Sequence, residues 1–176
     1  MNLAALQHLT KAASALADNC RLVVIGSASL LASFPDMGRE DGPLAQTFDA
    51  DLSPEPFDET TALMLDQAMG ESKAFHLRHG YHADIMRPAI FETLPNGWHQ
   101  RLVPVPGVER ALALDPTDLA AVKVLVGRPK DLNLVRILIS ESRVNFRVLA
   151  DRVFQIELDE RLLQKVSRTL NELEVA

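Results

Sequence analysis

The hydrophobic pattern of the first half of the chain predicts helices that alternate with short strands. Apolar residues recur every three or four positions over residues 3–18, which indicates an amphipathic helix. Branched apolar residues at 21–25 predict a buried strand, and strict alternation over 47–52 predicts a second one. A further helix is expected at 61–69, followed by a strand at 80–86 that begins at a glycine. The pattern therefore favours a sheet covered by helices.

The second half changes from strands to helices. A strand is expected at 98–104 and a short final strand at 110–114. From residue 115 onward the apolar spacing is helical, and four amphipathic helices are predicted, which begin near residues 116, 129, 144 and 159. The sequence thus predicts an α/β (α+β) fold, with a small mixed sheet and flanking helices. We expect residues 1–114 to form the α/β core and residues 115–176 a C-terminal helical portion of the same compact unit.

The strand at 47–52 carries two acidic residues on one face. Side chains alternate along a strand, so Asp49 and Asp51 point to one side and Ala50 and Leu52 to the other. Two carboxylates about 7 Å apart repel each other unless water or a cation lies between them. Mg²⁺ is held in proteins by one or two such carboxylates together with substrate phosphates. The pair is therefore a candidate metal site.

A third acidic residue lies on the strand expected at 80–86. Alternation places His82 and Asp84 on the same face of that strand. Asp84 is either the third carboxylate of the candidate site or an ordinary solvent-facing residue of an edge strand. The nearby His76 and His79 are of a type that binds zinc. We expect no regular element to place the histidines together, and so expect them to pack beside the site or to lie on the surface.

The turn after the first strand adds a candidate phosphate contact. Gly26 and Ser27 follow the buried run and precede a short helix expected at 27–33. The turn could be a plain strand-to-helix connection with a capping serine, or its backbone N–H groups could face a phosphate.

These residues together resemble a known superfamily. A hydrophobic run that ends in Gly26 and Ser27, then a helix, then Asp49-x-Asp51 on the next strand resembles the polymerase-β-like nucleotidyltransferases. The resemblance implies that Asp49 and Asp51 bind Mg²⁺ or Mn²⁺ and a nucleoside triphosphate, and that Asp84 completes the catalytic and metal site. The 22 positions from Ser27 to Asp49 exceed the usual spacing of that superfamily. The excess is interpreted as a polar surface insert at 35–43.

A second resemblance covers the start of the helical portion. Residues 114–119, Lys123, and the segment with Arg128 and Asp131 are similar to the branch that includes nucleotidyltransferase toxins of toxin–antitoxin and abortive-infection systems. It implies that Gly26, Ser27, Lys123, Arg128 and Asp131 contact the nucleotide. It also implies a tRNA or protein acceptor and a cognate antitoxin as partners.

Lys123, Arg128 and Asp131 also have structural interpretations that involve no nucleotide. Lys123 could lay its apolar stem along the helix surface, and Asp131 could cap its helix while paired with Lys130 or Arg128.

Composition limits the function classes. The net charge of −6 argues against a protein that coats nucleic acid without specificity. The charge is uneven, however, with ten acids and one Arg over residues 36–71 and seven basic residues and three acids over 123–152. A single cysteine, Cys20, excludes an internal disulfide framework, and no apolar run is long enough for a membrane span. We therefore expect a cytoplasmic protein without a membrane partner.

Two functions fit the sequence. One is metal-dependent transfer of a nucleotide from an NTP to a tRNA end or a protein side chain. The alternative is a catalytically silent module that retains the fold and binds a nucleotide or a protein partner. Convergence of the three carboxylates would favour the enzyme, whereas carboxylates that point apart would favour the silent module.

Overall fold

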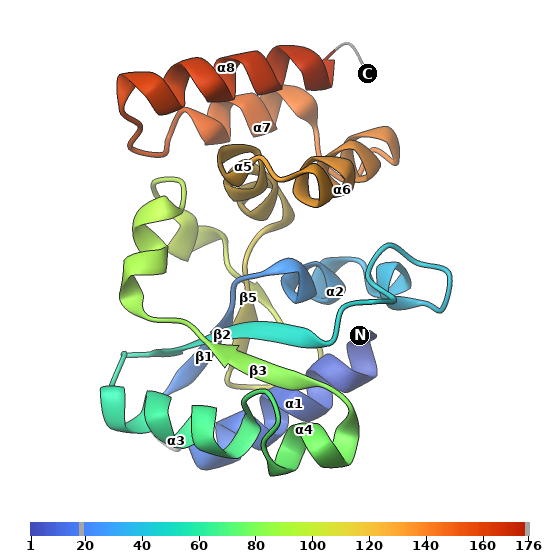
Figure 1. Cartoon of the computed structure of the whole chain (residues 1–176), viewed down its shortest axis with the longest axis vertical. Helices are drawn as coiled ribbons and strands as arrows, with labels where there is room; N and C mark the ends of the chain where they lie inside the picture. The colour runs from blue at the N-terminus through green and yellow to red at the C-terminus, as the bar shows by residue number, and fades with distance from the viewer. Residues whose placement is uncertain (18–19, 175–176) are drawn as a thin grey trace. The chain divides into compact units, whose positions relative to one another are not determined.

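A computed structural model describes residues 1–17 and 20–174, and its central feature there is a mixed sheet of five strands (Figure 1). The strands are β1 (Arg21–Val24), β2 (Asp49–Glu55), β3 (His82–Ile85), β4 (Val103–Pro104) and β5 (Ala111–Ala113). Their order across the sheet is β3-β2-β1-β5-β4. The predicted small mixed sheet with flanking helices is confirmed.

Strand β1 lies at the centre of the sheet because three of its four side chains are apolar. Leu22, Val23 and Val24 are fully buried, as expected for a strand covered on both faces. It pairs antiparallel with β2 and parallel with β5. Strand β2 in turn pairs parallel with β3. The end of β1 therefore meets the first half of β2, where the acidic residues lie.

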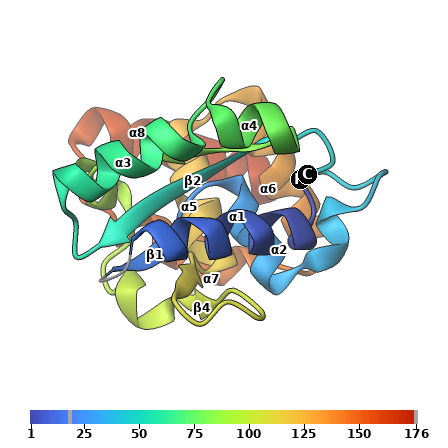
Figure 2. The same cartoon turned by 90° about the horizontal axis from the view of Figure 1, so that it is seen from below.

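Helices pack against this sheet within the first part of the chain. They are α1 (Leu3–Leu16), α2 (Leu30–Ser33), α3 (Glu59–Met69) and α4 (Ala74–His79). Helix α1 begins where Asn2 Oδ1 accepts a hydrogen bond from the N–H of Ala5 at 2.9 Å. It buries an apolar stripe of Leu6, Leu9 and Ala13. Helices α1 and α3 contact each other and the sheet, and Figure 2 shows them side by side across it.

Two strand predictions were wrong in extent. Residues Trp98–Arg101 form the 3₁₀ helix η4 rather than a strand, because Trp98 turns inward after Gly97 and stacks on Phe91 with ring centroids 4.8 Å apart. The strand predicted at 47–52 is instead β2, which runs from Asp49 to Glu55. The antiparallel pairing with β1 continues there to the ion pair between Arg21 and Glu55.

The predicted polar surface insert is a folded segment. The short helix before it starts as the 3₁₀ turn η1 (Ser27–Ser29), continues as α2 and leads into the 3₁₀ helix η2 (Pro35–Gly38). Met37 and Leu44 are only 1% and 2% exposed, and the N–H of Leu44 donates to the carbonyl of Met37 at 2.9 Å. Buried apolar anchors thus fix the segment at both ends, and β2 enters the sheet in register despite the extra residues.

The chain divides into two compact units. The first comprises residues 1–88 and 101–115, and the second comprises residues 89–100 and 116–176. The second unit contains most of η3 (Pro88–Thr93) and of η4, together with α5 (Pro116–Val126), α6 (Pro129–Ser140), α7 (Phe146–Val153) and α8 (Glu160–Glu174). Helix α5 contacts α6, α7 and α8. It buries an apolar side that includes Leu119, Ala120 and Val124, so it is the core of this unit.

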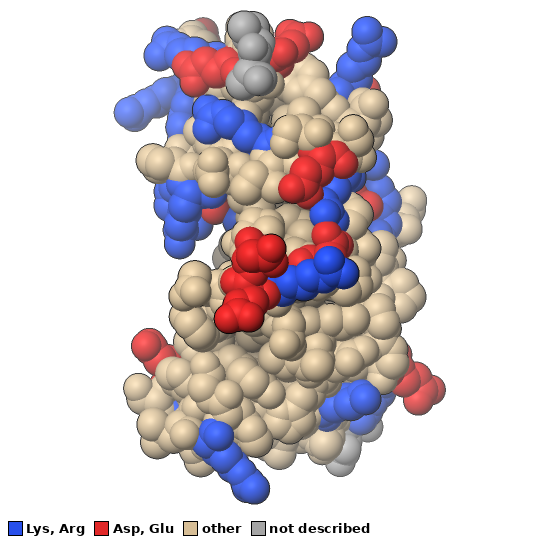
Figure 3. Space-filling view, turned by 90° about the vertical axis from the view of Figure 1, so that its right-hand side faces the viewer, with Lys and Arg blue, Asp and Glu red and all other residues tan. Residues whose placement is uncertain are grey.

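No helix within residues 1–17 and 20–174 combines the length and the apolar character needed to cross a lipid bilayer. On the face drawn in Figure 3, Lys and Arg side chains are interspersed with Asp and Glu, and uncharged residues cover much of the rest.

Candidate active site

Strand β2 presents the two predicted acidic residues on one face of the sheet. Asp49 and Asp51 are each half-buried, whereas Ala50 and Leu52 between and after them are fully buried on the opposite face. The alternation of the strand produces this division, since Ala50 and Leu52 belong to the core. The two carboxylates are therefore held by a strand whose other face is fixed by packing.

Strand β3 brings the third acidic residue next to the pair. In the parallel pairing of β2 with β3, Asp51 lies opposite Asp84 and Asp49 lies opposite His82. Partner residues in adjacent strands share a face, so Asp84 joins Asp49 and Asp51. Each of the three carboxylates offers one oxygen, and these oxygens lie within 4.8 Å of one another. In the part of the chain that the structure describes, no other group of three His, Cys, Asp or Glu side chains meets this criterion.

Gly26, two residues after the end of β1, lies against the same cluster. Its backbone is extended, with φ −79° and ψ −161°, so glycine is not required there for conformational freedom. A methyl group on its Cα would instead lie 2.7 Å from Cγ of Asp51 and closer still to Oδ2. The N–H of the preceding Ile25 donates to the Asp51 carbonyl at 2.9 Å. The missing side chain at position 26 thus makes room for the Asp51 carboxylate.

The turn after Gly26 lies partly exposed beside the carboxylates. Gly26 and Ser27 are both half-buried, and the turn η1 contacts β2. The N–H of Ser29 donates to the Gly26 carbonyl at 2.9 Å, which closes the turn. The Ser29 hydroxyl is buried, and no residue among those described hydrogen-bonds to it. Ser29, in the same turn as Ser27, is a buried polar residue that the sequence pattern did not single out.

Electrostatics around Asp84 favour a cation. Burial raises the pKa of Asp84. The nearby His82 lowers it, and the negative charges of Asp49, Glu71 and Asp66 raise it further. The net effect is a pKa above the ordinary value of 3.8. A positive charge among the carboxylates would reverse this penalty on the ionised form.

The histidines lie partly on a helix that the sequence did not predict. His76 and His79 belong to α4 and His82 belongs to β3, so no single element places the three histidines together. His79 packs against His8, Phe75 and Tyr81. The His76 ring lies 4.7 Å from the His82 ring, centroid to centroid. His76 and His82 therefore pack beside the carboxylates, as the sequence led us to expect.

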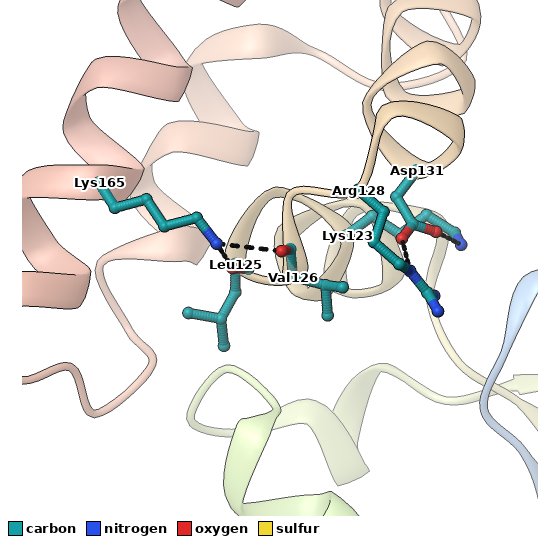
Figure 4. Close-up of polar contacts among 6 residues, drawn as sticks. All are labelled: Lys123, Leu125, Val126, Arg128, Asp131 and Lys165. Atoms are coloured by element: carbon teal, nitrogen blue, oxygen red, sulfur yellow. Dashed lines mark hydrogen bonds and ion pairs between the residues drawn. The ribbon is translucent and has the colours of Figure 1, made fainter.

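The predicted nucleotide contacts of the helical portion form an ion-pair cluster in the second unit (Figure 4). The Asp131 carboxylate, 2% exposed, accepts hydrogen bonds from Lys123 Nζ at 2.8 Å and from Arg128 Nε at 2.5 Å. Lys123 is also buried, whereas the Arg128 side chain is 60% exposed. The predicted pairing of Asp131 with Arg128 is present. The second partner of Asp131 is Lys123 rather than the predicted Lys130.

These pairings change the acidity of Asp131. Burial alone would raise the pKa of Asp131, but the hydrogen bonds and positive charges of Arg128 and Lys123 outweigh it. The pKa consequently lies below its ordinary value, and Asp131 is ionised at neutral pH. Nearby, Lys165 Nζ of α8 donates to the carbonyls of Leu125 and Val126 at 3.2 and 3.0 Å. It thereby caps the last turn of α5 (Figure 4).

The three carboxylates have the chemistry of a site for a hard divalent cation. Mg²⁺ and Mn²⁺ prefer oxygen ligands, and all three donors are carboxylate oxygens. Partial exposure of each residue leaves room for water and for substrate phosphates to complete the coordination. The residues present therefore fit such an ion.

A small mixed sheet that presents three carboxylates beside a Gly-Ser turn fits a nucleotidyltransferase-type fold. Over residues 2–174 the chain matches a family described as "Nucleotidyltransferase of unknown function (DUF6036)". The chain belongs to this family. No match was found among curated proteins or among solved structures.

Proposed function

We propose that the protein transfers a nucleotide from a nucleoside triphosphate to a macromolecular acceptor and requires Mg²⁺ or Mn²⁺. The observation that carries the proposal is the convergence of Asp49, Asp51 and Asp84, whose oxygens lie within 4.8 Å of one another on two adjacent strands. Like charges so close together are unfavourable unless a cation neutralises them. Membership of a nucleotidyltransferase family supports the same class of activity.

Each carboxylate has a role in this proposal. Asp49 and Asp51 would hold the divalent ion, which when bound stabilises the charge that develops on the attacking and leaving oxygens. Asp84 would be a third ligand or the general base, since its pKa above the ordinary carboxyl value suits it to accept a proton. Gly26 and Ser27 would face the triphosphate through the backbone N–H groups of the turn.

The chemistry balances with these groups alone. A hydroxyl oxygen of the acceptor forms a bond to the α-phosphorus of the NTP, and the bond between that phosphorus and the bridging oxygen of pyrophosphate breaks. The proton of the hydroxyl passes to Asp84 if that residue is the general base, or to water if Asp84 is a metal ligand, and pyrophosphate leaves with the electron pair of the broken bond. A tRNA end or a protein side chain with a hydroxyl group would meet this requirement.

Among Lys123, Arg128 and Asp131, the predicted nucleotide contacts of the helical portion, we propose that Arg128 alone contacts the nucleotide. Lys123 is buried against Asp131, so of the two cations Arg128 has the more exposed side chain. Within this cluster we assign phosphate binding to the Arg128 guanidinium, and we assign Lys123 and Asp131 to holding it in place.

Label transfer tests the proposal directly. The protein is incubated with each of the four α-labelled NTPs and Mg²⁺ or Mn²⁺, alone, with total tRNA, or with a cell protein extract. We expect label in one acceptor fraction with one preferred NTP, and none after addition of EDTA or in Asp49→Asn. Absence of label in every fraction from the wild type would contradict the enzyme and favour the silent nucleotide-binding or partner-binding module.

A further inference from the structure

His82 lies against the carboxylate cluster without being one of its acids. It is the register partner of Asp49 in the β2–β3 pairing. Its Nε2 lies 3.4 Å from Oδ1 of Asp84, two residues further along the same strand face. The imidazole is only 12% exposed, compared with 45% for the Asp84 side chain. A nearly buried polar ring therefore lies beside one oxygen of a partly exposed carboxylate.

The ring of His82 packs against a ring of helix α4. The His76 ring of α4 packs on it at 4.7 Å with an interplanar angle of 42°. His76 is itself fixed, because its Nδ1 accepts a hydrogen bond from the N–H of Ser72 at 2.9 Å. The α4 segment thus limits the orientations that the His82 imidazole can take, and Nε2 stays directed toward Asp84.

The second ring nitrogen indicates which tautomer the site accommodates. His82 Nδ1 is buried, and no residue in the described part of the chain hydrogen-bonds to it. A proton on this nitrogen would be a buried donor without an acceptor, which is unfavourable. The proton of a neutral imidazole therefore belongs on Nε2, where it can be donated to Oδ1 of Asp84.

We propose that His82 is a positioning residue that orients the Asp84 carboxylate for metal binding. Nε2 lies 3.4 Å from one oxygen, and a hydrogen bond donated across this short gap would fix the plane of the carboxylate and leave the other oxygen for the ion shared with Asp49 and Asp51. The inference rests on the proposed function, since it assumes that the three carboxylates bind a divalent cation. Groups that orient a ligand in this way change metal affinity by about 10- to 100-fold in other metal sites.

Mn²⁺ binding, measured by the loss of the free-ion electron paramagnetic resonance signal, tests the inference without nucleotide or acceptor. His82→Leu keeps the bulk of the ring but has no donor, and we expect it to weaken Mn²⁺ binding at least about tenfold. His82→Gln places an amide N–H near the position of Nε2, and it should restore most of that loss. His82→Asn is too short to reach Asp84 and should remain weak.

His79→Leu is the matched control. His79 lies on α4 near His76 but packs against His8 and Phe75, so this variant should bind Mn²⁺ as the wild type does. Wild-type affinity in His82→Leu would overturn the inference, and so would equal affinities of the Gln and Asn variants. The Gln and Asn comparison decides the question even if the Leu variant does not fold. A wild type that does not bind Mn²⁺ would overturn the proposed function, and the inference with it.

Discussion

The carboxylate of Asp51 occupies the space that any side chain at position 26 would need. A methyl group on Gly26 would approach Cγ of Asp51 to 2.7 Å, and the backbone of Gly26 has ordinary extended angles. Glycine is therefore required at this position by an acidic side chain on the neighbouring strand rather than by the turn itself. The relationship ties the Gly-Ser turn and the Asp pair into one structural unit.

Gly26→Ala should displace the Asp51 carboxylate and weaken the metal site. Because alanine can adopt the backbone angles at position 26, the side chain of Asp51 must move instead, which separates it from Asp49 and Asp84. We expect at least about tenfold weaker Mn²⁺ binding, measured as above, since a misplaced ligand costs about as much as a lost orienting contact.

Gly80→Ala is the control for this substitution. Gly80 ends α4 with φ +78°, and a methyl group there would meet no atom within 4 Å. Alanine at this position should cost roughly 1 kcal/mol of folding stability through its left-handed backbone, and it should leave Mn²⁺ affinity unchanged. Unchanged affinity in Gly26→Ala would show that the approach of Asp51 to Gly26 does not matter for the site.

Mn²⁺ or Mg²⁺ should raise the melting temperature of the wild type, and Asp49→Asn should abolish the rise. A ligand that binds only the folded state stabilises it by about 2.7 kcal/mol at a concentration 100 times its Kd. Asn removes one ligand charge with little change of shape. Asp41→Asn, an exposed acid in the segment before β2, serves as the matched control in differential scanning fluorimetry and should keep the full rise. An identical rise in Asp49→Asn would place the ion elsewhere.

Asp84→Asn should stabilise the metal-free protein at neutral pH. Burial and neighbouring acids raise the pKa of Asp84 in the folded state above its ordinary value of 3.8. Ionised Asp84 therefore opposes folding above that raised pKa. As pH falls through the raised pKa the folded protein takes up the proton, and below about 3.8 the penalty is gone.

Urea unfolding in EDTA at pH 7 and at pH 3.5 measures this difference. We expect the Asn variant to have the higher unfolding free energy at pH 7 and no advantage at pH 3.5. In the label-transfer assay the same variant should lose activity by several orders of magnitude if Asp84 is the base or a ligand. Wild-type transfer rates in Asp84→Asn would remove Asp84 from the proposed site.

Lys123→Met should destabilise the helical unit more than Arg128→Met does. Asp131 and Lys123 are both buried, so removal of the lysine leaves a buried carboxylate with only one strong partner. Loss of a buried partner costs about 3–5 kcal/mol when the remaining charge is unpaired. Because Arg128 still contacts Asp131, we expect a loss of roughly 2 kcal/mol. The Arg128 side chain is 60% exposed, and its removal should cost less.

Chemical denaturation of the two variants at pH 7 compares these losses. Equal stability of Lys123→Met and the wild type would contradict a structural role for the buried pair. If Arg128 contacts phosphate as proposed, Arg128→Met should weaken NTP binding while its fold remains close to wild type.

The sequence predicted most of the strands and helices and the strand face on which each acidic residue lies. Alternation along β2 separates Asp49 and Asp51 from buried Ala50 and Leu52, and it likewise places His82 with Asp84. The helix start at Pro116 follows from local capping preferences. These features depend on the period of a strand or helix and on neighbours within a few positions, so they can be inferred from the chain alone.

Element boundaries were less well predicted where packing outweighs local preference. Pro54 and its neighbours have turn-forming composition, yet they continue β2 because they pair with β1. The segment around Met37 has a polar composition, but two buried side chains anchor it. Helix α4 was not predicted, because its six residues carry no apolar stripe and bury none of their side chains fully.

The sequence by itself determined which side chains share a face of a strand, because that follows from the two-residue repeat of the backbone. Only the tertiary structure decided which faces meet. It set Asp84 opposite Asp51, brought Gly26 against the Asp51 carboxylate, directed His82 toward Asp84, and paired Lys123 with Asp131 across two helices. The physical reason is that strand register and helix packing are fixed by burial of apolar surface over the whole unit, a sum over residues far apart in the chain.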